Sequence, residues 1–112
     1  METNILGTEY KIIFGNKENF SALSEMNGYT DSSIKQIVVD DCKDVENTVG
    51  AKKNMKEFVD KVLRHEIIHA FLYESGLAEN SSWATEEEMI DFFAIQFPKI
   101  QKVFKELNIG EE

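Results

Sequence analysis

The feature that most limits how this chain can fold is a long amphipathic stretch from about residue 54 to residue 75. Apolar residues recur there at spacings of three and four, beginning with Met55 and continuing to Phe71. Such spacing predicts one long helix with a single apolar face. Gly76 is a typical residue for ending a helix of this kind. The rest of the chain is therefore expected to supply the elements that cover this face.

Two segments before the helix are predicted to be strands. Residues 9–14 are rich in strand-forming residues and stop at the turn signal Gly15-Asn16. Residues 34–40 alternate between apolar and polar at first and are then continuously apolar, which is also typical of a strand. We expect a small sheet of two or three strands that packs against the long helix.

Two further helices are predicted after the long one. The first covers residues 84–97, and either Ser82 or Thr85 could cap it; Thr85 has a glutamate three residues later, which is the spacing of a capping box. Pro98 is expected to end this helix, because a proline disfavours helical geometry in the residue before it. The last helix is predicted over residues 99–107. This order of elements predicts a single α+β domain over residues 1–112.

Length and charge restrict the class of protein further. The chain has 112 residues and a formal net charge of −9, which argues against nucleic acid or an anionic membrane as the main partner. No apolar run is long enough to cross a membrane, and the N-terminus does not resemble a signal peptide. The single cysteine, Cys42, cannot form an internal disulfide. These features together predict a cytoplasmic protein.

Both histidines of the chain lie in the long predicted helix, in the run HEIIH, as His65 and His69. Residues four apart project from one face of a helix, so two imidazoles can bind a single ion. Glu66 is turned by about 100° from His65 and can flank such an ion without binding it. That is the position of a general base that takes a proton from a metal-activated water. The alternative is that both histidines are ordinary helix residues.

A third ligand is needed, because a catalytic zinc usually has three protein ligands and one open position. With both histidines used, the third ligand must be Asp, Glu or Cys. Cys42 is one candidate, although lone cysteines are mostly ordinary packing residues. Glu87 and Asp91 are four apart and share a face, and Glu88 with Asp91 is the rival pair. In either pair Asp91 could accept the N–H of a bound histidine and fix its tautomer.

HEIIH followed about eighteen residues later by EEMID resembles the gluzincin pattern, in which H-E-x-x-H on one helix is completed by N-E-x-x-x-D on the next. The resemblance is closest to the miniature gluzincin-like domains and to short zinc-peptidase-like proteins of bacteriophages and prophages. It is strong over residues 54–100 and implies a zincin-like fold. It also implies one zinc ion with the ligands His65, His69 and Glu87, with Glu66 as general base and Asp91 in contact with a ligand histidine.

A second, more distant similarity is to the ImmA/IrrE type of peptidase, which cleaves repressors. Its later helix carries a signature similar to the run from Glu88 to Ala94, and that alignment implies Glu88 as the third ligand. Glu86 stands where the larger gluzincin family tends to have Asn, so Glu87 and Glu88 both stay candidates.

The zincin scaffold implies two further parts of the site. An edge strand beside the cleft binds the substrate backbone in extended form. Tyr73, one turn beyond His69, could stabilise an oxyanion, although such a tyrosine is more often a core or rim residue. The residues expected to form the edge strand are Ile34, Lys35, Gln36, Ile37, Val38 and Val39.

The sequence therefore predicts a zinc metallopeptidase that acts on a peptide or protein and binds neither nucleic acid nor membrane. Two alternatives stay open. One is a zinc-stabilised protein-binding module with weak or no activity, which the small size would suit. The other is a phage regulatory peptidase of the antirepressor type that acts on one specific protein. Glu66 favours chemistry, because a purely structural site has no need of a base beside the ion.

Overall fold

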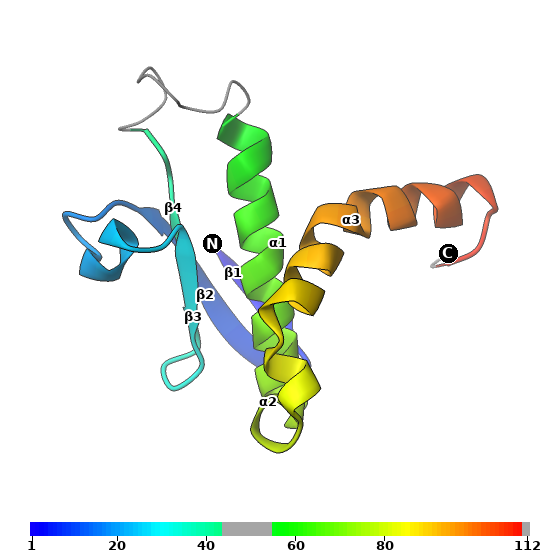
Figure 1. Ribbon diagram of the computed structural model, residues 1–112, viewed down its shortest axis with the longest axis horizontal. Coiled ribbons are helices and arrows are strands. Elements are labelled where there is room, and N and C mark those ends of the chain that lie inside the picture. Colours follow the sequence, from blue (N-terminus) through cyan, green and yellow to red (C-terminus); the bar gives the residue numbers. More distant parts are fainter. Residues whose placement is uncertain (44–54, 111–112) are drawn as a thin grey trace.

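The computed structural model describes residues 1–43 and 55–110 and has an α+β architecture (Figure 1). A four-stranded sheet lies on one side, and the long helix α1 packs across it. Short turns of 3-10 helix occur at Ser21–Ser24 and Ser82–Thr85. The strands are β1 (Glu2–Ile5), β2 (Thr8–Gly15), β3 (Gly28–Asp31) and β4 (Gln36–Asp40), and the helices are α1 (Met55–Glu74), α2 (Leu77–Asn80) and α3 (Glu87–Glu106).

The sheet has the order β1-β2-β4-β3, so β4 is an interior strand and β3 is at the edge. β2 and β4 are parallel, and the two outer pairs are antiparallel. The prediction of two or three strands was wrong, because β1 and β3 carry little apolar pattern of their own. β1 is instead fixed by a tight turn to β2, in which Leu6 and Gly7 both have positive φ, 50° and 91°. This geometry suits the two-residue hairpin turns that match strand twist.

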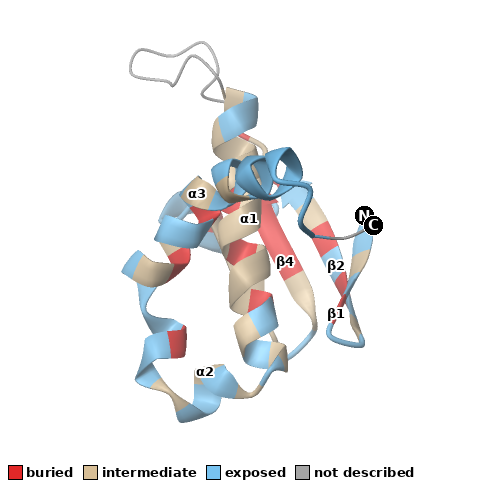
Figure 2. Cartoon of the chain, turned by 90° about the vertical axis from the view of Figure 1, so that its right-hand side faces the viewer, coloured by how far each residue is buried: buried red, intermediate tan, exposed pale blue. Residues whose placement is uncertain are grey.

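The core lies between the sheet and α1 (Figure 2). β2 alternates as a half-buried strand should, with Tyr10 and Ile12 facing inward and Lys11 exposed. Ile37 on β4 and Ala70 on α1 have no exposed surface and belong to the same cluster. The predicted helix over residues 54–75 corresponds to α1, which places HEIIH in its second half. Because one face of this region is fixed by the core, the other face is free to carry polar groups.

α3 continues through Pro98, so the predicted break between residues 97 and 99 was wrong. A proline inside a helix leaves the carbonyl four residues earlier without its usual donor. Here that carbonyl belongs to Ala94, and it accepts a 2.7 Å hydrogen bond from Nε of Arg64 on α1. The missing hydrogen bond is thereby replaced from a neighbouring helix. Figure 1 shows the two halves of α3 running in different directions, as expected of a helix bent at proline.

The start of α3 also differs from the prediction. Ser82 and Thr85 lie in the preceding 3-10 turn, where the Thr85 hydroxyl donates to the Ser82 carbonyl at 3.0 Å. The N-cap is Glu86, whose side chain accepts a hydrogen bond from the backbone N–H of Glu88. α3 therefore begins at Glu87, one residue after its cap. Among the described helices, none is long and apolar enough to span a membrane.

Candidate metal centre

His65 and His69 project from the same face of α1, toward the first turn of α3. Their ring centroids are 5.0 Å apart. Both side chains are largely buried, with 16% and 15% of their surface exposed. The helical spacing of four residues produces this arrangement directly, since it brings two side chains one above the other.

Glu87 bridges the two imidazoles from the opposite helix. Its Oε2 lies 2.9 Å from Nε2 of His65, and its Oε1 lies 2.9 Å from Nε2 of His69. The possible ligand atoms of these three residues all lie within 4.8 Å of one another. The described residues thus form a group that could hold a metal ion. Glu88 and Cys42, the other candidates for the third ligand, are outside this group.

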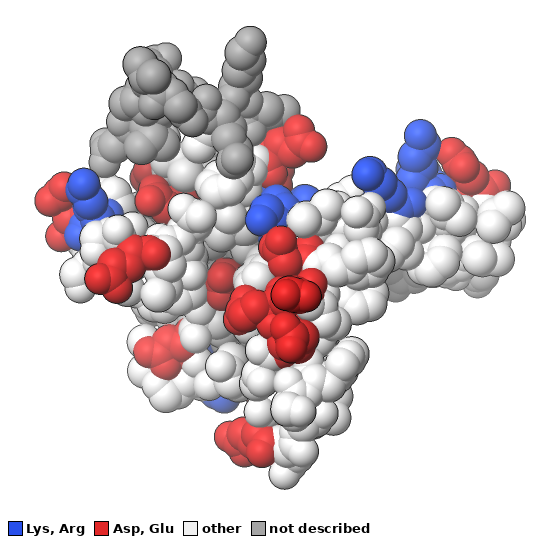
Figure 3. Space-filling view, viewed as in Figure 1, with Lys and Arg blue, Asp and Glu red and all other residues white. Residues whose placement is uncertain are grey.

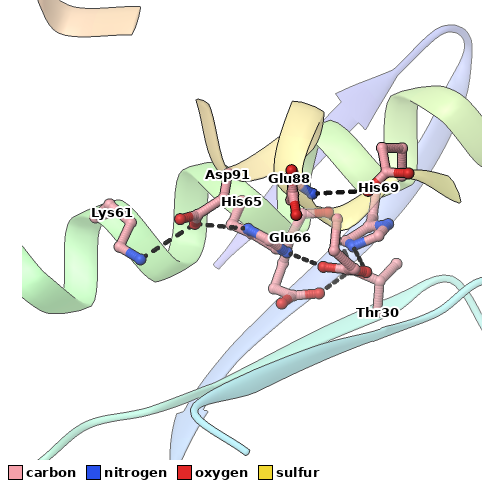
Figure 4. Close-up of polar contacts among 9 residues, drawn as sticks. Thr30, Lys61, His65, Glu66, His69, Glu88 and Asp91 are labelled. Atoms are coloured by element: carbon pink, nitrogen blue, oxygen red, sulfur yellow. Dashed lines mark hydrogen bonds and ion pairs between the residues drawn. The ribbon is translucent and has the colours of Figure 1, made fainter. Parts of the chain in front are cut away.

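His65 faces a carboxylate at each of its ring nitrogens. Nδ1 lies 3.2 Å from Oδ1 of Asp91, while Nε2 faces Glu87 (Figure 4). A neutral imidazole has one N–H and one lone pair, so it can donate to only one of the two. The second contact then places a nitrogen lone pair against a carboxylate oxygen, which is repulsive. A cation at Nε2, or a proton that makes the ring an imidazolium, removes that repulsion.

Asp91 has the position expected of a residue that orients a ligand histidine. Besides His65, its Oδ1 accepts a 3.2 Å hydrogen bond from Nζ of Lys61 (Figure 4). Partial burial alone would raise the pKa of Asp91, but Lys61 and His65 together hold this pKa below its usual value. Asp91 is therefore ionised near neutral pH and favours the tautomer of His65 in which Nδ1 carries the proton. That tautomer leaves Nε2 available as a ligand.

Glu66 is the one charged residue among the fully buried side chains of the described chain, with 7% of its surface exposed. The hydroxyl of Thr30 lies 3.0 Å from both Oε1 of Glu66 and its backbone carbonyl. Burial raises the pKa of Glu66, while Thr30 and the two histidines lower it and Glu87 raises it further. Glu66 lines the same cleft as the three candidate ligands but is outside their group.

A cleft of about 440 Å³ opens over this group. One wall is α1, from Lys61 to Tyr73, and the opposite wall is the segment that leads into β3 and the strand itself. The side chains of Glu87 and Asp91 close the cleft from α3. Figure 3 shows acidic side chains gathered on the same face of the molecule. The volume lies within the range of about 300–1,000 Å³ that is common for ligand sites.

The edge strand beside the cleft is β3, so the prediction of residues 34–39 was wrong. Ile34 and Lys35 precede β4, and the remaining residues are paired with β2 on one side and β3 on the other. An interior strand has no backbone groups left for a further strand. A continuous apolar run is typical of a strand that is buried on both faces, and it does not distinguish an edge strand from an interior one. β3 lies at the sheet edge, and Gly28, Tyr29 and Thr30 line the cleft.

Gly28 allows β3 to approach α1 closely. A Cβ at this position would lie 2.9 Å from Cγ1 of Val62 and 3.4 Å from Cγ of Glu66. The 2.9 Å distance to Val62 is shorter than an ordinary contact, so a side chain here would push the strand away from the helix. Gly28 thus positions Thr30 for its hydrogen bonds to Glu66.

Tyr73 also belongs to the cleft, one helical turn beyond His69. Its ring stacks on that of His69, with centroids 6.4 Å apart and an interplanar angle of 28°. The side chain lines the cleft and is 38% exposed. Tyr73 therefore belongs to the wall of the cleft and not to the core.

Sequence reasoning missed Gly28, Thr30 and Lys61, which line the cleft, and Arg64, which joins α1 to α3. Lys61 could have been found, because it lies four residues before His65 on the same predicted face. Gly28 and Thr30 depend on the pairing of β3, for which the local sequence offers only a turn signal. Arg64 depends on the continuation of α3 through Pro98.

The chain was also compared with known proteins. No protein-family model matches it, and no curated protein or solved structure does either.

Proposed function

We propose that this protein is a zinc-dependent metallopeptidase whose ion is held by His65, His69 and Glu87. The observation that carries the proposal is the convergence of two Nε2 atoms on the two oxygens of one carboxylate, each at 2.9 Å. With no cation present, neutral Nε2–H tautomers could serve both contacts with Glu87, but Nδ1 of His65 would then turn its lone pair toward Oδ1 of Asp91, 3.2 Å away. The arrangement therefore suits an ion better than it suits a simple hydrogen-bonded cluster.

The donor set fits zinc in particular. Two imidazole nitrogens and one glutamate oxygen are a common ligand set for catalytic zinc, which keeps a fourth position open. Cobalt, nickel and manganese accept similar donors, so the identity of the ion rests on ligand type. When bound, such an ion polarises a carbonyl and lowers the pKa of water to near neutral.

Glu66 is the proposed general base. Its Oε1 is held by Thr30, which fixes the carboxylate in the cleft beside the candidate ligands. It would accept a proton from the attacking water and deliver that proton to the leaving amine. The resemblance to gluzincins implies the same role for the residue after the first histidine.

The substrate is proposed to be an extended peptide. β3 is an edge strand, and its residues Gly28, Tyr29 and Thr30 line the cleft. A peptide can add to such an edge through backbone hydrogen bonds. Tyr73 lines the opposite wall and is the proposed donor of a hydrogen bond to a developing oxyanion.

An inactive zinc-stabilised binding module is the second candidate, and a single-residue comparison separates the two. Glu66→Gln keeps the shape of the side chain and touches none of the proposed ligands. The purified wild type and this variant should both hold about one zinc per chain. Cleavage of a mixed peptide library, read by mass spectrometry, should occur with the wild type only.

The control for that experiment is Glu88→Gln, which removes a neighbouring charge outside the proposed ligand group and should keep both zinc and cleavage. If wild type and Glu66→Gln hold zinc and neither cleaves any peptide or protein, the binding module is the better account. If the wild type holds no metal, both candidates are wrong. A regulatory peptidase with one protein substrate would cleave that protein and leave the peptide library intact.

A further inference from the structure

The second half of α3 extends away from the rest of the molecule. Every residue from Gln101 to Gly110 is exposed, although several are large and apolar, such as Val103 at 50% and Leu107 at 65%. The Cα radius of gyration is 15.2 Å, whereas a compact domain of this length is expected to have roughly 13 Å. Figure 1 shows the end of α3 as an arm that extends from the rest of the described chain. An apolar arm of this kind is unfavourable in water and suits a protein partner.

The apolar residues of α3 form a regular row. Alternating spacings of four and three residues connect six positions along the helix, and five of the six are apolar. This is the spacing of a coiled-coil seam, in which two helices pack side by side. At 100° per residue, the row is turned by about 120° from Ile90 and Ala94, the α3 residues that are buried. The row consists of Met89, Phe93, Gln96, Ile100, Val103 and Leu107.

The charges of α3 indicate what packs on the row. The start of the helix is acidic, whereas its second half carries Lys99, Lys102 and Lys105 against the single carboxylate of Glu106; Figure 3 shows both signs on one face. Two copies of such a helix repel when they lie parallel, since like ends meet. They attract when they lie antiparallel. An anionic membrane surface would attract the lysines but repel the acidic start and the chain as a whole, with its net charge of −9.

The row also matches itself in the antiparallel orientation. With Pro98 at the twofold axis, Met89 of one copy meets Leu107 of the other, and Phe93 meets Val103. Gln96 and Ile100 lie beside the bend of α3 at Pro98, so the two outer layers, Met89 with Leu107 and Phe93 with Val103, form the contact. Pro98 itself is half a turn away from the row at 100° per residue, so its ring stays outside the contact.

We propose that α3 is a self-association helix, which pairs antiparallel with α3 of a second copy of this chain through the row. The proposal does not depend on the metallopeptidase function. In such a dimer, the end of each arm lies along the first turns of the partner helix, on the side away from α1. Each copy would thereby cover the outer face of the turn that carries the other copy's Glu87, which is 66% exposed in the single chain.

Sedimentation velocity of the full chain tests the proposal. The wild type should be in a monomer–dimer equilibrium at micromolar concentration. Val103→Asp places a charge in the row of an exposed helix and should raise the dissociation constant by about 100-fold. Ile95→Asp is the matched control, because Ile95 is equally apolar and 44% exposed but lies outside the row; it should change the constant by less than about 3-fold. A monomeric wild type at several hundred micromolar, or equal effects of the two variants, would overturn the proposal.

Disulfide cross-linking in a Cys42→Ser background tests the orientation. Leu107→Cys alone should not cross-link, because antiparallel pairing separates the two positions by about 27 Å. Met89→Cys combined with Leu107→Cys should cross-link between copies under mild oxidation. Cross-linking of Leu107→Cys alone would mean parallel pairing and contradict the proposal. So would a monomeric wild type that sediments with anionic vesicles and loses this binding in Val103→Asp, since the row would then be a membrane-binding face.

Discussion

Two polar clusters lie on α1, and they differ in how their charges are balanced. At the end of the helix, Glu74 accepts hydrogen bonds from the Tyr10 hydroxyl at 2.7 Å and from Nζ of Lys35 at 2.8 Å. These contacts lower the pKa of Glu74 to about 2. Two turns earlier, burial raises the pKa of Glu66. The cluster around Glu74 thus has donors for its one carboxylate. The cluster around Glu66 combines three carboxylates with one lysine and two histidines.

The difference indicates separate roles for the two clusters. The cluster of Tyr10, Lys35 and Glu74 links β2 and the segment before β4 to α1, and every contact in it stabilises the fold. The cluster of His65, Glu66, His69, Glu87 and Asp91 has more acceptors than donors, which costs stability unless a cation is added. We therefore expect a metal ion to stabilise the protein through the second cluster only.

The largest expected effect is the loss of zinc-dependent stability on removal of a ligand. With zinc at about 1,000 times its dissociation constant, the wild type should gain about 4 kcal/mol in the free energy of unfolding. His69→Ala should gain almost nothing, whereas Glu74→Gln should keep the full gain on a lower baseline. Thermal unfolding of each variant with zinc and with a chelator measures its gain in stability from the metal. Equal gains in the two variants would contradict the separation of roles.

A smaller effect is expected at Asp91, which orients His65 through its Nδ1. Asp91→Asn keeps the shape and removes the charge that favours the required tautomer. The zinc affinity should fall by about 10- to 100-fold, the usual range for groups that support a ligand. Calorimetric titration with zinc at constant pH measures the change. An affinity equal to that of the wild type would mean that Asp91 pairs with Lys61 alone.

The contact between α1 and α3 can be tested without metal. Arg64→Met removes the donor to the Ala94 carbonyl and should lower the free energy of unfolding by about 1–3 kcal/mol. In a Pro98→Ala background, Arg64→Met should lower the free energy of unfolding by less, because position 98 then supplies its own backbone N–H to the Ala94 carbonyl. Urea unfolding of the wild type, the two single variants and the double variant gives the coupling free energy between Arg64 and Pro98. Additive effects would show that Arg64 does not replace the missing hydrogen bond.

The smallest effect concerns acid stability. The pKa of Glu74 is lower in the folded state, about 2, than its ordinary value of 4.5. The stability that Glu74 contributes is therefore complete above pH 4.5 and is lost as the pH falls from 4.5 toward 2. Glu74→Gln should be less stable than the wild type at pH 6, and the difference should shrink at pH 3 and below.

The control for this pH series is Asp60→Asn, whose partner Lys56 is 84% exposed. Surface pairs of this kind contribute little, so the unfolding curves of this variant should follow those of the wild type at each pH. A pH-independent difference for Glu74→Gln would mean that its carboxylate is not ionised in the folded state below pH 4.5.

The long helix α1 and the candidate ligands follow from the sequence, because they depend on local spacing. The pattern from residue 54 to residue 75 predicted α1, and HEIIH placed two histidines on one face. Glu87 and Asp91 were predicted as a pair because they are four residues apart. In each case the spacing and the side-chain type carry the information, and no long-range contact is needed.

The parts that the sequence did not predict depend on contacts between distant segments. The continuation of α3 through Pro98 depends on Arg64, thirty residues before Ala94. The edge position of β3 depends on which neighbours β4 takes, and residues 34–39 look like a strand whether at the edge or inside. The choice between Glu87 and Glu88 depends on where α3 begins, and that point is set by the cap at Glu86.

The most direct measurement is zinc binding by equilibrium dialysis to the wild type, Glu87→Ala and Glu88→Ala. We expect about one zinc per chain for the wild type and for Glu88→Ala, with an affinity more than about 100-fold weaker for Glu87→Ala. If Glu88→Ala loses zinc and Glu87→Ala keeps it, the third ligand has been assigned to the wrong residue. If the wild type binds no zinc at all, the two histidines are ordinary residues of a helix and the proposed function is wrong.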